Sequence, residues 1–232
     1  MQNESRQAHW ENIYTHKGES EVSWYQESPA LSLELIERVG ATSISAIIDI
    51  GGGASHLVDN LVDRSFEDVT VLDLSDAALR AAKDRLGSRA AQVQWVVADA
   101  TVWEPMKAYD VWHDRAAFHF LTEDRDRVAY VMRLKQGLKV GGHAIIATFA
   151  LDGPERCSGL PVVRYDPVSL GKTLGMAFQL VDTRRHAHAT PWASKQSFQF
   201  SVFRHCTYAA PPTCNVVPNS LKQLHDSHRR LK

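Results

Sequence analysis

The chain has 232 residues, of which 44% are apolar, enough for one globular domain with a substantial core. Its 26 basic and 27 acidic side chains give a formal net charge of -1, which argues against a protein that grips nucleic acid or an anionic membrane through bulk charge. No run approaches the roughly 18 consecutive apolar residues of a membrane span, so the sequence predicts no transmembrane helix.

Cysteine usage favours a reducing compartment. Cys157, Cys206 and Cys214 are too few and too irregularly spaced for a disulfide framework. The polar first residues show no apolar stretch of a secretory signal. We therefore expect a cytoplasmic protein. No feature of the sequence specifies an oligomeric state.

The predicted elements begin with a helix, a loop and a second helix, which together form an N-terminal helical lid segment, 1–40. After it, short apolar runs alternate with helical patterns. Strands are predicted at 45–50, 69–74, 93–97, 109–113 and 143–149, the last after a turn at Gly141-Gly142. Helices are predicted at 56–64, 76–86 and 124–138. Ser75 is a natural N-cap and Gly87 a natural stop for the second of these helices.

Such alternation of strands and helices predicts parallel strands joined by crossover helices. The strands are nearly continuous apolar runs, which is typical of a sheet covered on both faces. Two longer strands, 178–188 and 196–205, are expected to pair antiparallel at the sheet edge. The core domain is thus 41–208, a doubly wound α/β sheet, followed by a loosely ordered polar tail, 209–232, with a short helix near 221–224.

The strongest local signal is the sequence IIDIGGGAS at residues 47–55, which follows a buried strand and precedes a helix. Glycines allow positive φ and let a ligand approach the backbone closely. Ligands of open α/β sheets bind at the carboxyl ends of the strands, where this loop lies. The pattern is neither G-x-G-x-x-G nor a P-loop. Alone, it is also compatible with a tight structural turn.

Acidic residues follow the next two strands. Asp73 ends the second strand, about 20 residues beyond the glycine loop, where a carboxylate can accept both hydroxyls of a ribose. Asp99 ends the third strand and can accept a hydrogen bond from an adenine amino group. Each acid alone is compatible with a helix cap, but their order after successive strands is far more specific.

With this arrangement the sequence resembles the class I S-adenosylmethionine-dependent methyltransferases over residues 44–149. The resemblance implies a Rossmann-like, seven-stranded, mostly parallel sheet with an antiparallel last strand, and S-adenosylmethionine as the cofactor. It implies that Asp49, Gly51 and Gly53 line the methionine part, Asp73 and Leu74 the ribose, and Asp99 and Ala100 the adenine. The chain departs from the family pattern at Ser55, in place of a third glycine, and at Val140, in place of a proline.

The N-terminal segment contributes aromatic residues. Trp10, Tyr14 and Trp24 stand in a stretch similar to the leading segments of the thiol and thiopurine methyltransferases and of the elongation-factor lysine methyltransferases. That similarity implies that they cover the cofactor and shape the acceptor pocket. Aromatic side chains exclude water and can contact a sulfonium cation. The alternative is that Trp10 and Tyr14 only pack on the sheet.

Candidate catalytic residues follow the fourth strand. Asp114 or His119 can take a proton from an acceptor, and Arg115 can hold an anionic one. His119 can equally be a histidine satisfied in the wall of the domain. A zinc site at His186 and His188 is disfavoured, because no compact Cys/His spacing supports it, and we predict no metal.

The sequence therefore predicts an enzyme that transfers a methyl group to a small-molecule acceptor, because the chain is compact. A protein lysine methyltransferase is the second hypothesis. A nucleic-acid methyltransferase is third, since neither a catalytic Asn-Pro-Pro-Tyr motif nor a basic surplus is present. A protein that binds the cofactor or another nucleotide without catalysis is the alternative from a different class.

Overall fold

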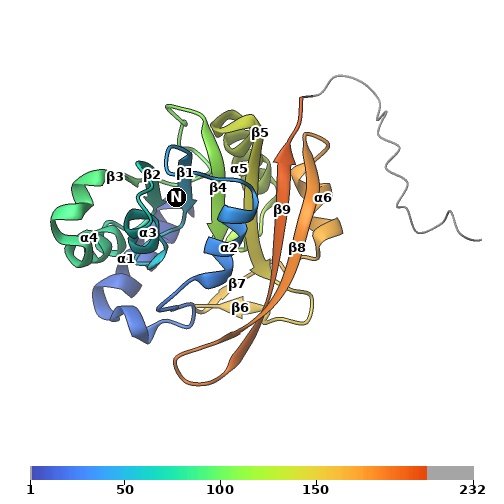
Figure 1. Cartoon of the computed structure of the whole chain (residues 1–232). Helices are drawn as coiled ribbons and strands as arrows, with labels where there is room; N and C mark the ends of the chain where they lie inside the picture. Colours follow the sequence, from blue (N-terminus) through green and yellow to red (C-terminus); the bar gives the residue numbers. More distant parts are fainter. Residues whose placement is uncertain (1, 208–232) are drawn as a thin grey trace, which may run out of the picture.

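The computed structural model describes residues 2–207 and arranges them around one seven-stranded sheet (Figure 1). The strands lie in the order β3 (Val93–Val97), β2 (Asp68–Asp73), β1 (Ala46–Ile50), β4 (Tyr109–Arg115), β5 (Leu138–Phe149), β9 (Lys195–His205) and β8 (Phe178–Ala189). Neighbours from β3 to β5 are parallel, whereas β9 runs antiparallel to both β5 and β8. The predicted Rossmann-like sheet with an antiparallel last strand is confirmed.

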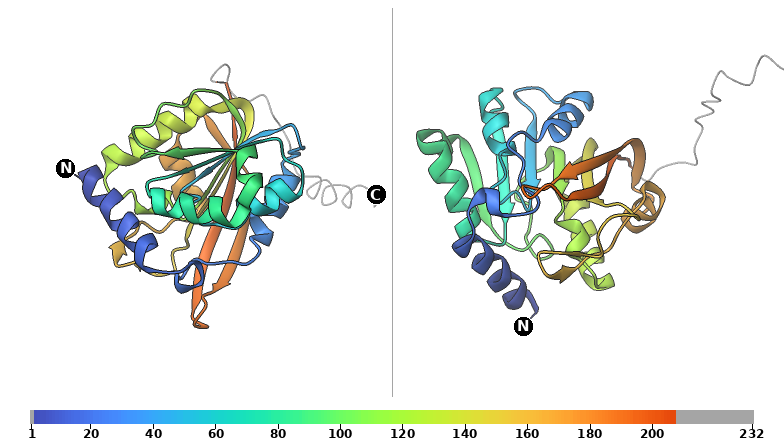
Figure 2. Two further views of the ribbon diagram at one scale, coloured as in Figure 1. Left: turned by 90° about the vertical axis from the view of Figure 1, so that its left-hand side faces the viewer. Right: turned by 90° about the horizontal axis from the view of Figure 1, so that it is seen from below.

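Helices cover both faces of the sheet (Figure 2). One face carries α2 (Ala30–Arg38), α3 (Leu57–Asp63) and α4 (Asp76–Leu86); the other carries α5 (Asp124–Gly137) and α6 (Pro167–Leu174). The first helix, α1 (Gln2–His16), contacts α4. Shorter elements are the 3-10 turns η1 (Glu19–Glu21), η2 (Gly87–Gln92) and η3 (Phe118–Phe120) and the hairpin of β6 (Arg156–Cys157) and β7 (Leu160–Pro161).

The sheet separates two apolar cores, and strand β1 contributes to both. Ile47 of β1 packs in the core under α3 and α4, whereas Ile48 packs in the core under α5. The helices that follow β1 and β2 cover one face of the sheet, whereas the helix that follows β4 covers the other. Strands β1 and β4 are neighbours in the sheet, so the connections change face between them. In open α/β sheets this switch opens a crevice at the carboxyl ends of the strands, and the glycine loop follows β1 at that place.

Helix α4 shows how closely local signals set its ends. It begins after Ser75, whose hydroxyl accepts a hydrogen bond from the Ala78 N–H, and ends at Gly87, which has φ +59°. Both ends agree with the prediction.

The start of β5 was predicted wrongly. Gly141 and Gly142 do not turn the chain into the strand but lie inside it, since β5 already begins at Leu138. The pairing of β4 with β5 shifts register between Tyr109 and Val111, and Gly141 has φ +87°. The glycines therefore allow an irregularity within a paired strand, which the sequence shows in the same way as a turn.

Helix α6, the β6–β7 hairpin and the three 3-10 turns were not predicted. Helix α6 nevertheless carries a signal, because Asp166 accepts the Ser169 N–H at 2.7 Å and Pro167 occupies the first turn. Within residues 2–207 no helix is long and apolar enough to cross a membrane. The prediction for the tail, 209–232, lies outside the described residues, and the boundary between 1–40 and 41–208 stays a prediction.

Candidate functional site

A crevice lies over the carboxyl ends of β1, β2, β3 and β4, beneath α1. It encloses about 820 Å³ including its open mouth. Among the predicted site residues, those that line it are Trp10, Tyr14, Trp24, Gly51, Asp73, Leu74, Asp99, Ala100 and Arg115. Asp49, Gly53, Asp114 and His119 are not among the lining residues.

The glycine loop crosses the floor of the crevice. The N–H groups of Gly51 and Gly52 both donate to the Leu72 carbonyl, which ties the loop to β2. Gly51 has φ +65°, and a Cβ there would lie 2.6 Å from the Cβ of Ala117. At Gly53 (φ +47°) a Cβ would lie 3.0 Å from the Asp73 carboxylate. Glycine is thus required at both positions for the β1, β2 and β4 ends to meet.

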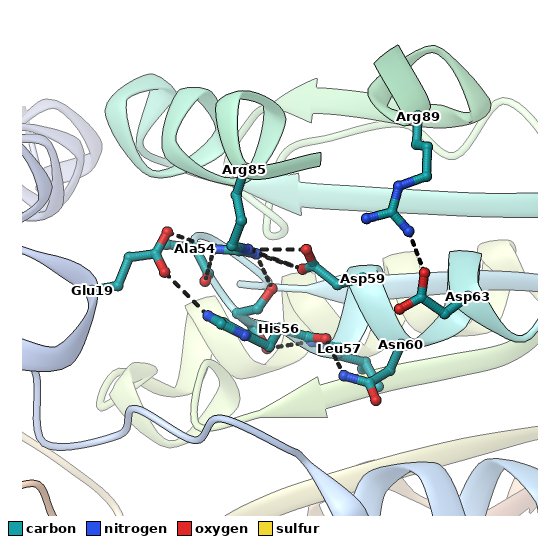
Figure 3. A network of polar contacts seen from close by, with 10 residues as sticks. Glu19, Ala54, His56, Leu57, Asp59, Asn60, Asp63, Arg85 and Arg89 are labelled. Atoms are coloured by element: carbon teal, nitrogen blue, oxygen red, sulfur yellow. Dashed lines mark hydrogen bonds and ion pairs between the residues drawn. The ribbon is translucent and has the colours of Figure 1, made fainter. Parts of the chain in front are cut away.

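An arginine that was not predicted, Arg85, holds this loop (Figure 3). Arg85 of α4 donates to the carbonyls of Ala54 (3.0 Å) and Ser55 (2.9 Å). The same guanidinium pairs with Asp59 of α3 at 2.6 Å and with Glu19 of η1 at 2.5 Å. One planar side chain thus joins three helical segments to the glycine loop. In the sequence, the local signal for this role of Arg85 is only that it is a basic residue in the last turn of α4.

Asp49 supports the crevice from behind rather than lining it. Its carboxylate lies 2.7 Å from Nδ1 of His113, whose Nε2 lies 2.9 Å from the Ser32 hydroxyl. All three side chains are buried. Asp49 therefore links the end of β1 to β4 and α2, and its predicted contact with the methionine part stays a prediction.

Asp73 faces the crevice with one oxygen engaged. Its Oδ1 accepts the Ser75 N–H at 2.8 Å, and Oδ2 lies beside Gly53. Burial raises the pKa of this carboxyl to about 7, and the nearby Asp49 adds to the effect. A buried carboxylate at the end of β2 with an oxygen left for a ligand suits a pair of ribose hydroxyls.

Asp99 is more heavily engaged. Its Oδ1 accepts both the N–H and the hydroxyl of Thr101, at 2.8 and 2.7 Å. Its Oδ2 pairs with Arg6 of α1 at 3.0 Å, and Arg6 also contacts Asp126. An adenine amino group would therefore meet an oxygen that already holds a guanidinium.

Helix α1 is attached over the crevice by a second polar contact. Glu11 accepts the Ser75 hydroxyl at 2.7 Å and the Ala77 N–H at 3.2 Å, at the N-terminus of α4. A carboxylate is favourable there, because the first N–H groups of a helix lack partners within it. Neither Arg6 nor Glu11 was singled out from the sequence, because both read as ordinary charged residues of an exposed helix.

The N-terminal aromatic residues form one wall. Trp10 meets Trp24 and Phe120 edge to face, with ring centroids 5.7 and 5.0 Å apart. The Trp24 indole N–H donates to the Tyr14 hydroxyl at 3.2 Å. These side chains come from α1, the loop after η1, and η3, so three segments close this side of the crevice against water.

The predicted role of Asp114 does not agree with its surroundings. Its carboxylate is fully buried and accepts hydrogen bonds from the N–H groups of Ala117 (2.9 Å) and Phe118 (3.1 Å) and from the Tyr130 hydroxyl (2.6 Å). Burial raises its pKa to about 6. With its oxygens engaged by three donors, Asp114 holds the turn after β4 instead of facing an acceptor.

His119 likewise does not line the crevice. It is fully buried between Phe120 and Phe149, and its Nδ1 accepts the Phe149 N–H at 3.3 Å. Burial lowers its pKa to about 3, so the ring stays neutral. The ring lies in the wall of the domain, as in its alternative interpretation, but its buried Nε2 has no hydrogen-bond partner among the described residues, so it is not a fully satisfied histidine.

Within residues 2–207, no group of three or more His, Cys, Asp or Glu side chains is arranged to hold a metal ion. His188 contacts the Ser23 carbonyl at 2.7 Å, and His205 contacts the Leu138 carbonyl at 2.8 Å. These histidines link strands and loops.

Comparison with known proteins agrees with this geometry. Residues 47–142 match a family model described as a methyltransferase domain. This segment of the chain is similar to a methyltransferase domain. The glycine floor and the Asp73 carboxylate of the crevice fit a nucleoside laid across β1 and β2.

Among curated relatives, the domain is 27% identical over 191 residues to trans-aconitate 2-methyltransferase of Rhizobium leguminosarum bv. trifolii (strain WSM2304), covering 82% of this chain and 62% of the relative. It is 24% identical over 151 residues to the eEF1A lysine and N-terminal methyltransferase of Mus musculus, covering 61% of this chain. The match spans only 21% of that mouse protein.

Solved structures share the fold of the domain. The 1,6-didemethyltoxoflavin-N1-methyltransferase of Burkholderia thailandensis, solved with S-adenosylhomocysteine, has a TM-score of 0.63 at 19% identity, covering 88% of this chain and 85% of that one. A methyltransferase from Anabaena variabilis has a TM-score of 0.69 at 13% identity, covering 88% and 95%.

Proposed function

We propose that the protein transfers a methyl group from S-adenosylmethionine to a small-molecule acceptor. The observation that carries this proposal is the crevice in which Gly51, Asp73 and Ala100, from the ends of three successive strands, face one another under α1. A nucleoside with an extended side chain fits such a row. The methionine part would lie over Gly51, the ribose at Asp73 and the adenine between Asp99 and Ala100.

The bound cofactor would supply an activated methyl group on a positively charged sulfur. The residues of the chain then align the acceptor with that methyl group and exclude water. Trp10, Trp24 and Phe120 form the water-excluding wall, and their faces favour a cation nearby. For adenine to bind Asp99, its amino group must share or replace the Arg6 contact, so α1 and the cofactor compete for one carboxylate.

A small acceptor is supported by α1 and the aromatic wall, which cover the crevice. Trans-aconitate 2-methyltransferase, one of the similar proteins, is named for a small acceptor. The second candidate is methylation of a protein lysine, favoured by the similarity to the mouse eEF1A lysine and N-terminal methyltransferase. Methylation of peptides but of no small molecule would favour this second candidate.

Isothermal titration calorimetry with S-adenosylhomocysteine, and with NAD for comparison, tests the cofactor. The wild type should bind the first and not the second. Asp73→Ala should weaken binding at least tenfold while circular dichroism stays unchanged, because about 1.5 kcal/mol or more is expected for hydrogen bonds to a charged group. Asp63→Ala, an exposed carboxylate in α3, serves as the control. Unchanged affinity in Asp73→Ala would contradict the ribose assignment.

A further inference from the structure

Arg115 is a half-buried cation without an ion-pair partner among the described residues. It is the last residue of β4 and lines the crevice next to the glycine loop. Its guanidinium donates one hydrogen bond, from Nη2 to the Trp24 carbonyl at 2.8 Å. No carboxylate of residues 6–207 forms an ion pair with it, whereas most other arginines in that range have one. A guanidinium has five N–H donors, so most of those of Arg115 remain for a ligand.

The nearby carboxylates are engaged elsewhere. Asp49 contacts His113, Asp99 contacts Arg6 and Thr101, and Asp114 holds the turn after β4. Asp73 lies two strands away from Arg115, at the end of β2. Withdrawing a guanidinium from water without a paired anion is unfavourable, and burial lowers the pKa of Arg115 in accordance with this. A guanidinium that the fold keeps away from water without a paired anion is a candidate for binding a ligand.

The backbone around Arg115 is held in an unusual conformation. The next residue, Ala116, has φ +69° without being glycine, and its N–H donates to the Ala147 carbonyl at 2.9 Å. Left-handed backbone at a non-glycine residue costs about 1–2 kcal/mol and persists where the surroundings enforce it, often in functional sites. This bend places Arg115, Ala116 and Ala117 together on the crevice wall.

Arg115 also stands between two spaces. Together with Tyr14 and Trp24 it lines the crevice and a second, smaller hollow of about 300 Å³. The guanidinium is therefore accessible from both hollows.

Apart from Asp73, which is assigned to the ribose, the titratable side chains of the crevice offer an acceptor little help in losing a proton. Burial raises the pKa of the Cys157 thiol to about 11, and that of Tyr14 also rises. Asp114 and His119 face away. An acceptor that arrives already ionised needs no base, because its lone pair attacks directly.

From these observations we infer that the acceptor is a small carboxylic acid, bound as its carboxylate to Arg115 and methylated on a carboxylate oxygen. A planar guanidinium matches a carboxylate through two parallel hydrogen bonds. The oxygen–carbon bond forms as the sulfur–carbon bond breaks, and the electron pair of that bond stays on sulfur. The products are a neutral methyl ester and neutral S-adenosylhomocysteine, and no proton is released. Arg115 then loses its anionic partner, which favours product release. The inference rests on the proposed methyl transfer.

The test measures transfer of labelled methyl from S-adenosylmethionine to small mono-, di- and tricarboxylic acids, each paired with its amide and with an amine of the same skeleton. The wild type should methylate acids and leave their amides and amines unmodified. Arg115→Met should raise the KM for the best acid at least thirtyfold, and Arg115→Lys less. S-Adenosylhomocysteine affinity should stay within threefold. Arg38→Met, an exposed arginine of α2, is the matched control.

A second measurement separates the acceptor from the carboxylate of the cofactor itself. Arg115→Met and the wild type are titrated with S-adenosylhomocysteine and with methylthioadenosine, which lacks that carboxylate. Loss of affinity for the first ligand alone would assign Arg115 to the cofactor and overturn the inference. So would methylation of amines alone, of none of the acids, or an unchanged KM in Arg115→Met. Failure of the wild type to bind S-adenosylhomocysteine would instead remove the proposed function.

Discussion

Asp73 and Asp114 lie at the carboxyl ends of two parallel strands, β2 and β4, and burial raises the pKa of both carboxyls. They differ in the hydrogen-bond donors around them. One Asp73 oxygen meets the crevice, whereas the Asp114 oxygens meet two backbone N–H groups and Tyr130. Residue type and strand position therefore do not separate a binding carboxylate from a structural one, but the number of internal donors does.

The sharpest way to break this comparison is Asp114→Ala. It leaves two backbone N–H groups and the Tyr130 hydroxyl buried without an acceptor, and we expect a loss of about 3–5 kcal/mol of unfolding free energy. Urea denaturation followed by circular dichroism measures the loss. Asp63→Ala, exposed and outside the crevice, should stay within about 0.5 kcal/mol. Wild-type stability together with lost turnover would restore Asp114 as a proton acceptor.

A second comparison concerns two glycines with positive φ. Gly51→Ala adds a Cβ 2.6 Å from that of Ala117, whereas Gly40→Ala meets nothing within 4 Å. Both changes strain the backbone by about 1 kcal/mol, but only Gly51→Ala adds overpacking of about 1–3 kcal/mol. Thermal and urea denaturation should show this difference, and S-adenosylhomocysteine binding should weaken in Gly51→Ala alone. Equal losses in both variants would show that the β4 turn moves away freely.

Most of the fold was predictable because its signals are local. The strand at 93–97 is recognisable from its own residues, and Ser75 and Gly87 end a helix that lies directly between them. The structure places the strand and both caps as expected. The glycines of β5 misled because a glycine pair permits a turn and a bulge equally, and the pairing with β4 decides between them.

The candidate site was predictable in its cofactor half and less so in its acceptor half. Gly51 and Asp73 could be located because their order follows the order of the strands. Asp114 and His119 could not be classified, since Tyr130 of α5 and Phe149 of β5, which contact them, lie 16 and 30 residues away along the chain. Arg85 was missed for the same reason: its partners lie 26 to 66 residues away along the chain.

Arg85 and Arg89 test whether the glycine loop depends on its support (Figure 3). Arg85 binds two loop carbonyls and two carboxylates, whereas Arg89 pairs with Asp63 at the surface. Arg85→Ala should lower the unfolding free energy by about 2 kcal/mol, because it leaves partly buried acceptors unpaired. Arg89→Ala should stay within about 0.5 kcal/mol. We also expect weaker S-adenosylhomocysteine binding in Arg85→Ala alone, measured by calorimetry. If the two variants have the same stability and the same affinity, the glycine loop keeps its conformation without the Arg85 contacts.

The smallest expected effect concerns the pH dependence of cofactor binding. Ribose hydroxyls donate to an ionised carboxylate, and the pKa of Asp73 lies at about 7. S-Adenosylhomocysteine affinity should therefore weaken about tenfold between pH 8 and pH 6, since one pKa unit corresponds to a factor of ten. Asp73→Asn should bind S-adenosylhomocysteine weakly and with little pH dependence.

The folding stability of the wild type should change with pH in the opposite sense. Folding raises the Asp73 pKa above its usual 3.8, so the wild type loses stability as pH rises from about 4 to about 7. Above pH 7, Asp73→Asn should therefore melt at a higher temperature than the wild type, and at pH 4 the two should converge. If the affinity of the wild type does not depend on pH, Asp73 is already ionised at pH 6. Burial and the neighbouring Asp49 would then raise its pKa less than expected.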